Sequence, residues 1–169
     1  MTVDVRCAEV DDAEALLAFR RRLFGETNFM LFEPAEFKST PDDERKFIER
    51  FAQRDNYRLL VACEAAEVVG FLAAMGGERN RNRHSVLVAL GVAKSHWSRG
   101  IAGRLLDDVI AWSATVGIRR LELTVHVTNV RAVGLYLRKG FEVEGRRRSS
   151  LCVDGQFVDE YLMSLILDA

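Results

Sequence analysis

The chain has 169 residues, of which 49% are hydrophobic and 29% charged, values typical of one folded domain over residues 1–169 rather than of a disordered or fibrous protein. Its 24 Lys and Arg residues nearly cancel its 25 Asp and Glu residues, so no net positive field would draw it onto nucleic acid or an anionic membrane. No apolar stretch approaches the roughly 18 to 20 residues that cross a bilayer, and the charged N-terminal segment does not resemble a signal peptide, so we expect a cytoplasmic protein.

Hydrophobic periodicity, capping residues and turn residues predict a chain of alternating strands and helices. The second helix has the clearest start, because Thr40 is a good N-cap and Pro41 suits the first helical position. In chain order the predicted elements are a strand at 2–7, a helix from 11 or 12 to 25, a helix at 41–53, strands at 57–63, 68–75 and 85–92, a helix at 100–116, a strand at 121–127, a helix at 130–138, and strands at 141–152 and 156–167.

Three of these elements indicate the fold class. Residues 85–92 are almost continuously apolar, which predicts a central strand buried on both faces. Residues 100–116 carry apolar side chains at steps of three and four, which predicts an amphipathic helix. The strand at 121–127 should then lie parallel to the first through a right-handed crossover. The whole order predicts a single-domain α/β (α+β) fold, with a mixed central sheet of about seven strands flanked by helices.

The three cysteines give no sign of a disulfide framework or a zinc site. Cys7, Cys63 and Cys152 lie far apart in the sequence and form no C-x-x-C pair. Each lies in an apolar run, so we expect buried, unreactive thiols and predict no metal site.

The segment from Leu90 to Leu106 passes from the predicted central strand through a short polar loop into the amphipathic helix. A helix N-terminus there offers unpaired backbone N–H groups and about half a positive charge, which can hold an anion. Small residues at the helix start would let a phosphate approach the backbone, and Arg99 and Arg104 would add charged hydrogen bonds. The same small residues would also let the helix pack closely on the sheet, so this segment alone leaves both interpretations open. The sequence has neither a G-x-x-x-x-G-K-[ST] loop nor a G-x-G-x-x-G motif.

A second motif follows the strand predicted at 121–127. Asn129, Ala132, Tyr136, Gly140 and Phe141 match the pattern N-x-x-A-x-x-[LI]-Y-x-x-x-G-F. Here the chain resembles the GNAT superfamily of acyl-CoA-dependent N-acetyltransferases. The resemblance covers the order of elements over nearly the whole chain and is sharpest between residues 86 and 141.

In that family the loop and helix start read Q/R-x-x-G-x-G/A, and Trp97, Gly100 and Ala102 stand at the defined positions here. Trp97 departs from the pattern and resembles a variant in relatives of the ribosomal-protein acetyltransferases. The resemblance implies that acetyl-CoA is the cosubstrate, with its pyrophosphate at this helix start and its pantetheine in a gap between splayed central strands. The cofactor-binding residues that it implies are Leu90, Val92, Trp97, Ser98, Arg99, Gly100, Ile101, Ala102, Gly103, Arg104, Asn129, Ala132 and Tyr136.

The resemblance also implies that Tyr136 is the general acid. A tyrosine with a pKa of about 10 is protonated at pH 7, so it can donate a proton to a leaving thiolate. Many family members carry an acidic residue on the strand that corresponds to residues 85–92, and this chain has none there. The candidates for the general base are Glu26 and Glu33, which we include in the predicted catalytic set, and Glu78, His84 and His126.

These observations predict transfer of an acetyl group to a primary amine by direct attack in a ternary complex, with no metal and no covalent enzyme intermediate. The acceptor would be a small-molecule or protein amine. The acidic side chains of the irregular segment 26–40 would suit its positive charge: Glu26, Glu33 and Glu36.

Two alternatives stay open at this stage. One is a catalytically inactive CoA-binding sensor or interaction module. The other is an RNA-associated adaptor that uses the arginines at 79–83 and 146–148. The predicted hairpin over 141–167 lies at a sheet end, and because unpaired edges are often covered by another chain, it predicts a homodimer.

Overall fold

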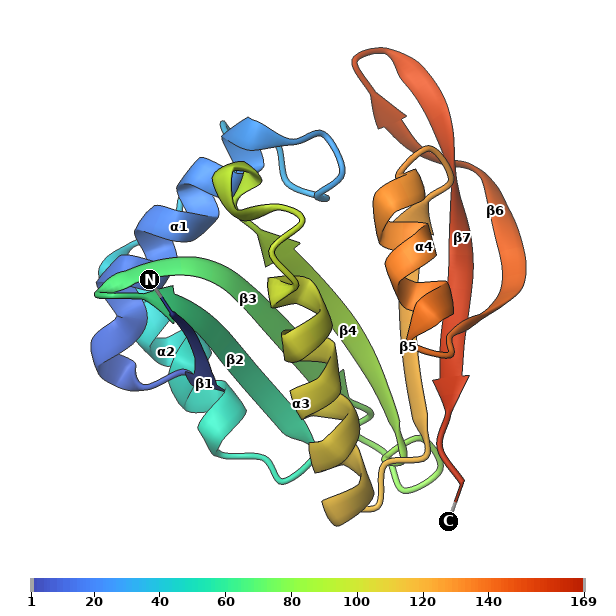
Figure 1. Cartoon of the computed structure of the whole chain (residues 1–169), viewed down its shortest axis with the longest axis horizontal. Helices are drawn as coiled ribbons and strands as arrows, with labels where there is room; N and C mark the ends of the chain where they lie inside the picture. Colours follow the sequence, from blue (N-terminus) through green and yellow to red (C-terminus); the bar gives the residue numbers. More distant parts are fainter. Residues whose placement is uncertain (1, 169) are drawn as a thin grey trace.

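The computed structural model describes residues 2–168 and forms one seven-stranded mixed sheet with helices on both faces (Figure 1). The strand order is β1-β2-β3-β4-β5-β7-β6, and only β4 and β5 pair in parallel. This is the α/β fold that the sequence predicts. In chain order the elements are β1 (Val3–Cys7), η1 (Val10–Asp12), α1 (Ala13–Glu26), α2 (Pro41–Ala52), β2 (Tyr57–Glu64), β3 (Glu67–Gly76), β4 (Ser85–Val92), η2 (Lys94–His96), α3 (Ile101–Thr115), β5 (Arg120–His126), α4 (Val130–Arg138), β6 (Glu142–Val153) and β7 (Gln156–Ile166).

Each face of the sheet has its own hydrophobic core. On one face α3 and α4 pack on the strands, with Leu105 and Tyr136 buried among them. On the other face α1 and α2 pack on the strands through Leu16 and Phe51. Within residues 2–168, no helix is long and apolar enough to span a membrane.

Local capping interactions fix the starts of two helices. The Thr40 hydroxyl accepts the Asp43 N–H at 3.2 Å, and the Asp43 carboxylate accepts the Thr40 N–H at 2.9 Å, so the predicted cap forms a complete capping box before Pro41. At the start of α4 the Asn129 side-chain oxygen accepts the Ala132 N–H at 3.3 Å. The motif asparagine therefore has a direct role in positioning α4.

The two central strands separate soon after they begin. β4 and β5 pair only from Ser85 with Arg120 to Leu87 with Glu122, although β4 continues to Val92. Beyond Leu87 the two strands diverge, and β4 keeps only β3 as a neighbour (Figure 1). The predicted splay of the central strands is confirmed, and it leaves a gap in the middle of the sheet.

The prediction that β4 is buried on both faces is wrong. Val86 and Val88 are buried, but Leu87 between them is 45% exposed. The reason is that α1 and α2 pack on β3 and β2 and leave this face of β4 uncovered around Leu87. A run of apolar residues cannot distinguish a strand buried on both faces from one that lines a cleft.

The expectation of three buried cysteines is also only partly correct. Cys7 and Cys152 are exposed, because they lie on β1 and β6, the two edge strands of the sheet. Cys63 lies on the inner strand β2 and is buried, and this burial raises the pKa of its thiol.

Candidate active site between the diverging strands

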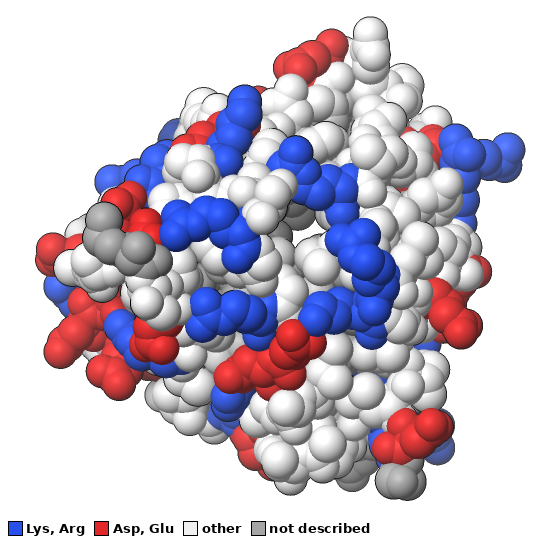
Figure 2. All heavy atoms as spheres, in the orientation of Figure 1, with Lys and Arg blue, Asp and Glu red and all other residues white. Residues whose placement is uncertain are grey.

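A cleft of about 1290 Å³ occupies the gap between β4 and β5. Its lining comes from both faces of the sheet. Ile101 and Tyr136 line it from the side of α3 and α4, and Phe29 and Met30 line it from the segment that follows α1. On the face of α3 and α4, Lys and Arg side chains surround a hollow in the surface (Figure 2). The cleft is therefore bordered by residues from both faces of the sheet.

The loop before α3 forms one end of the cleft. Gly100, directly before α3, has a left-handed backbone with φ 76°, and Ser98 also has a positive φ of 62°. A Cβ atom added at Gly100 would meet no atom within 4 Å, so the space in front of this helix start is open. The free N–H groups of the first turn of α3 therefore face a space that can receive an anion.

Two carboxylates hold this loop in place from outside the cleft. Glu26 accepts the backbone N–H of Lys94 at 2.8 Å. Glu64 binds Arg99 at 2.5 Å and the His96 ring at 3.0 Å, and these two bonds lower the pKa of Glu64 to about 2. The guanidinium of Arg99 is therefore already occupied by a protein carboxylate.

Trp97 connects the two sides of the gap. Its indole N–H donates to the backbone carbonyl of Val92, at the end of β4, at 2.9 Å. From the other side, the Arg131 guanidinium of α4 lies 4.3 Å from the centre of the Trp97 ring. This cation–π contact lies at the cleft, because both residues line it. The tryptophan that departs from the family pattern thus links the loop before α3 to α4.

Tyr136 lies between α4 and the sheet, in contact with the Phe141 ring, and lines the cleft. It is 7% exposed, and burial raises the pKa of its hydroxyl to about 12. The hydroxyl therefore keeps its proton at every pH at which the protein would normally function. It can donate that proton to a group in the cleft.

Polar side chains from three neighbouring strands form a row at the other side of the cleft. His126 ends β5, Glu160 is its partner on β7, and Arg147 is the partner of Glu160 on β6. All three line the cleft, and Glu160 is its only carboxylate among the described residues. Glu160 also accepts a hydrogen bond from the Ser150 hydroxyl at 2.5 Å and lies 3.6 Å from the Arg147 guanidinium.

The residues present suit acetyl-CoA. An elongated anionic thioester needs a phosphate site, a basic surround and backbone groups with no other partner. The first turn of α3 would supply the phosphate site, and Arg131 and Arg138 at the cleft would supply the basic surround. The backbone groups would come from β4 beyond Leu87, where no described strand pairs with it on the side of β5.

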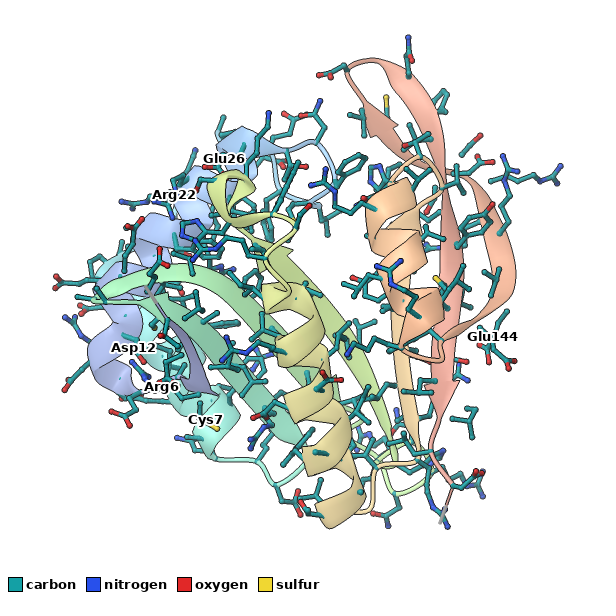
Figure 3. The ribbon with its side chains drawn as sticks, viewed as in Figure 1. Arg6, Cys7, Asp12, Arg22, Glu26 and Glu144 are labelled. Carbon is teal, nitrogen blue, oxygen red and sulfur yellow. The ribbon has the colours of Figure 1, made fainter. Side chains whose placement is uncertain are left out.

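Most of the predicted cofactor residues gather at this cleft, and four predicted site residues do not. Arg99 is bound to Glu64, and Arg104 is exposed on α3 outside the lining. Glu26 lies at the end of α1 beside the loop before α3 (Figure 3), and Glu33 is exposed and also outside the lining. The predicted residues that line the cleft are Leu90, Val92, Trp97, Ser98, Gly100, Ile101, Ala102, Gly103, Asn129, Ala132 and Tyr136.

Sequence reasoning missed several residues that line the cleft. Arg131 lies inside the recognised motif, but at a position that the motif leaves variable. Glu160 and Arg147 lie in the C-terminal hairpin and reach the cleft only because β7 pairs with β5 and β6 pairs with β7. Nothing in the local sequence marks Glu160, and Arg147 was noted only as part of the arginine cluster at 146–148. Phe29 comes from a segment without periodicity, and its ring lies 5.4 Å from that of His126.

Comparisons with known proteins agree with this geometry. The model of the acetyltransferase (GNAT) family matches residues 22–141. An L-amino acid N-acetyltransferase of Escherichia coli (strain K12) is 34% identical over 119 residues, which are 70% of this chain and 74% of that protein.

Two solved structures have the same fold. A GNAT-family acetyltransferase from Streptococcus pneumoniae has a TM-score of 0.95 and 32% identity, and the match covers 98% of this chain and 100% of that one. An acetyltransferase from Salmonella typhimurium, solved with acetyl-CoA, has a TM-score of 0.88 and 19% identity over 100% of this chain and 96% of that one. Acetyl-CoA is the acetyl donor of this fold. The family match and the E. coli relative, together with the cleft between the diverging strands, establish that this chain belongs to the acetyltransferase (GNAT) family and is an N-acetyltransferase.

Proposed function

We propose that this domain, over residues 1–169, transfers the acetyl group of acetyl-CoA to a primary amine by direct attack within a ternary complex. The observation that carries the proposal is the cleft through the gap between β4 and β5, because it is lined from both faces of the sheet. The donor would bind from the side of α3 and α4, where the basic residues and the open helix start lie. The acceptor would enter from the side of the segment after α1.

An amino acid is the first acceptor class to test. The E. coli relative is named an L-amino acid N-acetyltransferase. Arg147 and Glu160 line the cleft as an ion pair at 3.6 Å, and they would complement the carboxylate and the ammonium group of a zwitterion that binds between them. A cationic amine without a carboxylate would interact with Glu160 but would offer no partner to Arg147.

Acetyl-CoA supplies the thioester, and the residues of the chain supply the proton transfers. A lysine-like amine has a pKa of about 10.4, so deprotonating it at pH 7 costs about 4.6 kcal/mol, which a nearby base must help to provide. Tyr136 would donate its proton to the sulfur as the thiolate leaves, and its raised pKa keeps that proton available.

The direct test is thiol release from acetyl-CoA with a panel of amines that includes amino acids, amino acid amides, simple alkylamines and peptide N-termini. We expect thiol release that depends on the acceptor, with amino acids faster than their amides because the amides lack the carboxylate. Equal rates for acids and amides would contradict the role of Arg147. No release with any amine would favour the inactive CoA-binding module.

A further inference from the structure

We propose that His126 takes up the proton of the acceptor amine during acetyl transfer and that Glu160, its cross-strand partner on β7, stabilises the imidazolium that forms. This inference rests on the proposed N-acetyltransferase function and adds the group that accepts the proton. The carboxylates that the sequence suggested for this role, Glu26 and Glu33, do not line the cleft.

The His126 ring is a buried polar group without a partner. The residue is 4% exposed, yet it lines the cleft. Its Nε2 atom is buried and has no hydrogen-bond partner within residues 2–168. A buried ring nitrogen without a partner is costly, because it has lost its bond to water. The bound acceptor would satisfy this nitrogen by donating an N–H hydrogen bond to it.

His126 and Tyr136 approach the gap from opposite faces of the sheet. Val125 belongs to the same buried core as Tyr136, on the face of α3 and α4. Because successive strand residues point to opposite faces, His126 points to the other face, where its ring contacts the ring of Phe29. A proton acceptor on one face and a proton donor on the other match a reaction in which the amine arrives from one side and the thiolate leaves to the other.

The charged and titratable groups around His126 favour a neutral ring that can accept a proton. Burial lowers the pKa of His126, so the ring is neutral at pH 7. Glu160, opposite on β7, opposes this shift and would stabilise the imidazolium once it forms. Arg147 on β6 pairs with Glu160, and Arg131, Tyr136 and Arg138 line the cleft from α4.

Two protons leave the acceptor nitrogen during acetyl transfer. The acceptor enters as an ammonium ion and loses one proton, which His126 takes and passes to water. The amine nitrogen then bonds to the thioester carbon, the carbon–sulfur bond breaks, and its electron pair leaves on sulfur. The second N–H proton goes to His126, the sulfur takes the Tyr136 proton, and solvent returns both side chains to their starting states. In the overall reaction, acetyl-CoA and an ammonium ion give an amide, CoA thiol and one proton.

The first experiment compares His126→Gln with His84→Gln. His84 is exposed and lies outside the cleft lining, so its side chain should not matter. We expect His126→Gln to lower kcat/KM by about a hundredfold to ten-thousandfold at pH 7, the usual range for general base catalysis, while acetyl-CoA affinity is retained. A kcat/KM of His126→Gln within a few-fold of the His84→Gln value would overturn the proposal.

The second experiment uses the pH profile, which a merely structural histidine would not control. With kcat/KM referred to the neutral amine, the wild type should lose activity as the pH falls through a value below 6.5, where His126 becomes protonated. This acid limb should be absent in His126→Gln. In Glu160→Gln the limb should move to lower pH, because the carboxylate that raises the pKa of the ring is gone. An unchanged acid limb in both variants would contradict the proposal.

A third measurement needs no variant and so remains informative if His126→Gln does not fold. The pKa of His126, read by NMR in the wild-type protein, should equal the pKa of the kinetic acid limb. A mismatch of these values would exclude His126 as the base. Failure of the underlying function would look different, because the wild type would then release no thiol with any amine.

Discussion

At the level of single residues, removal of the Tyr136 hydroxyl should strongly lower the catalytic rate. Tyr136→Phe keeps the ring and its contact with Phe141 but removes the proton for the leaving sulfur. We expect kcat to fall by about a hundredfold to ten-thousandfold with little change in acetyl-CoA affinity. Tyr57→Phe is a matched control, because Tyr57 is a buried tyrosine in the core of the other face. Steady-state kinetics of both variants would test this, and equal kcat values would remove Tyr136 from the mechanism.

The pH profile of the wild type gives an independent check on Tyr136. Since burial raises the pKa of this hydroxyl to about 12, its deprotonation should not reduce kcat below about pH 10. A loss of activity centred near pH 10 that disappears in Tyr136→Phe would show an ordinary, exposed tyrosine instead.

Residues inside local motifs were predictable from the sequence, and residues assembled by strand pairing were not. Gly100 and Tyr136 belong to segments whose spacing indicates both the element and the role. Glu160 and Arg147 reach the cleft only because β7 pairs with β5 and β6 pairs with β7, and one sequence does not reveal this long-range pairing. His126 was among several candidates, and its burial without a partner is a tertiary property.

At the level of elements, the start of α3 should decide acetyl-CoA binding. Gly100→Leu places a side chain in the open space before the helix, so acetyl-CoA affinity should fall by at least about tenfold. Gly117→Leu is a close control, since Gly117 has φ 75° and equally open surroundings but lies outside the cleft lining. Both variants should lose about 1–2 kcal/mol of stability from the left-handed backbone. Calorimetric titration with acetyl-CoA should then separate them, and equal affinities would argue against this site.

The helices and strands were predicted almost completely, and the main error concerns the burial of β4. Periodicity and caps gave the order and nearly the bounds of every α-helix and strand, but not the short 3-10 helices η1 and η2. The exposure of Leu87 was missed because it depends on which strands α1 and α2 cover. The placement of these helices on the sheet is a long-range property that the apolar run in β4 does not reveal.

At the level of the whole molecule, ion pairs between elements should make stability depend on pH. Three arginines each lower the pKa of the carboxyl group with which they pair: Arg6 that of Asp12, Arg99 that of Glu64, and Arg120 that of Glu144. Because these pKa values are lower in the folded state, the stabilisation is present above about pH 4.5 and is lost as the pH falls towards 2. Urea unfolding midpoints from pH 6 to pH 2 should fall in this window, and the fall should be smaller in Arg120→Ala. A flat profile would contradict the pairing.

We also predict a homodimer, and the structure suggests where it would form. The outer edge of the sheet, β6, carries three consecutive arginines and two register shifts, which hinder pairing with another strand. Phe157, near the turn of the C-terminal hairpin, is 74% exposed and offers an apolar contact instead. Sedimentation at micromolar concentration should give twice the chain mass for the wild type and the chain mass for Phe157→Glu. A monomeric wild type would contradict the prediction.

The central claim, that the cleft between β4 and β5 is the site of acetyl transfer to an amine, is tested most directly by following an isotopically labelled acetyl group. Wild-type protein would be incubated with labelled acetyl-CoA and the amine panel, and the products separated and weighed by mass spectrometry. We expect the label on the nitrogen of the preferred amine, formed in step with CoA thiol, and little labelled product with Gly100→Leu. Labelled free acetate without acetylated amine, or full transfer by Gly100→Leu, would contradict it.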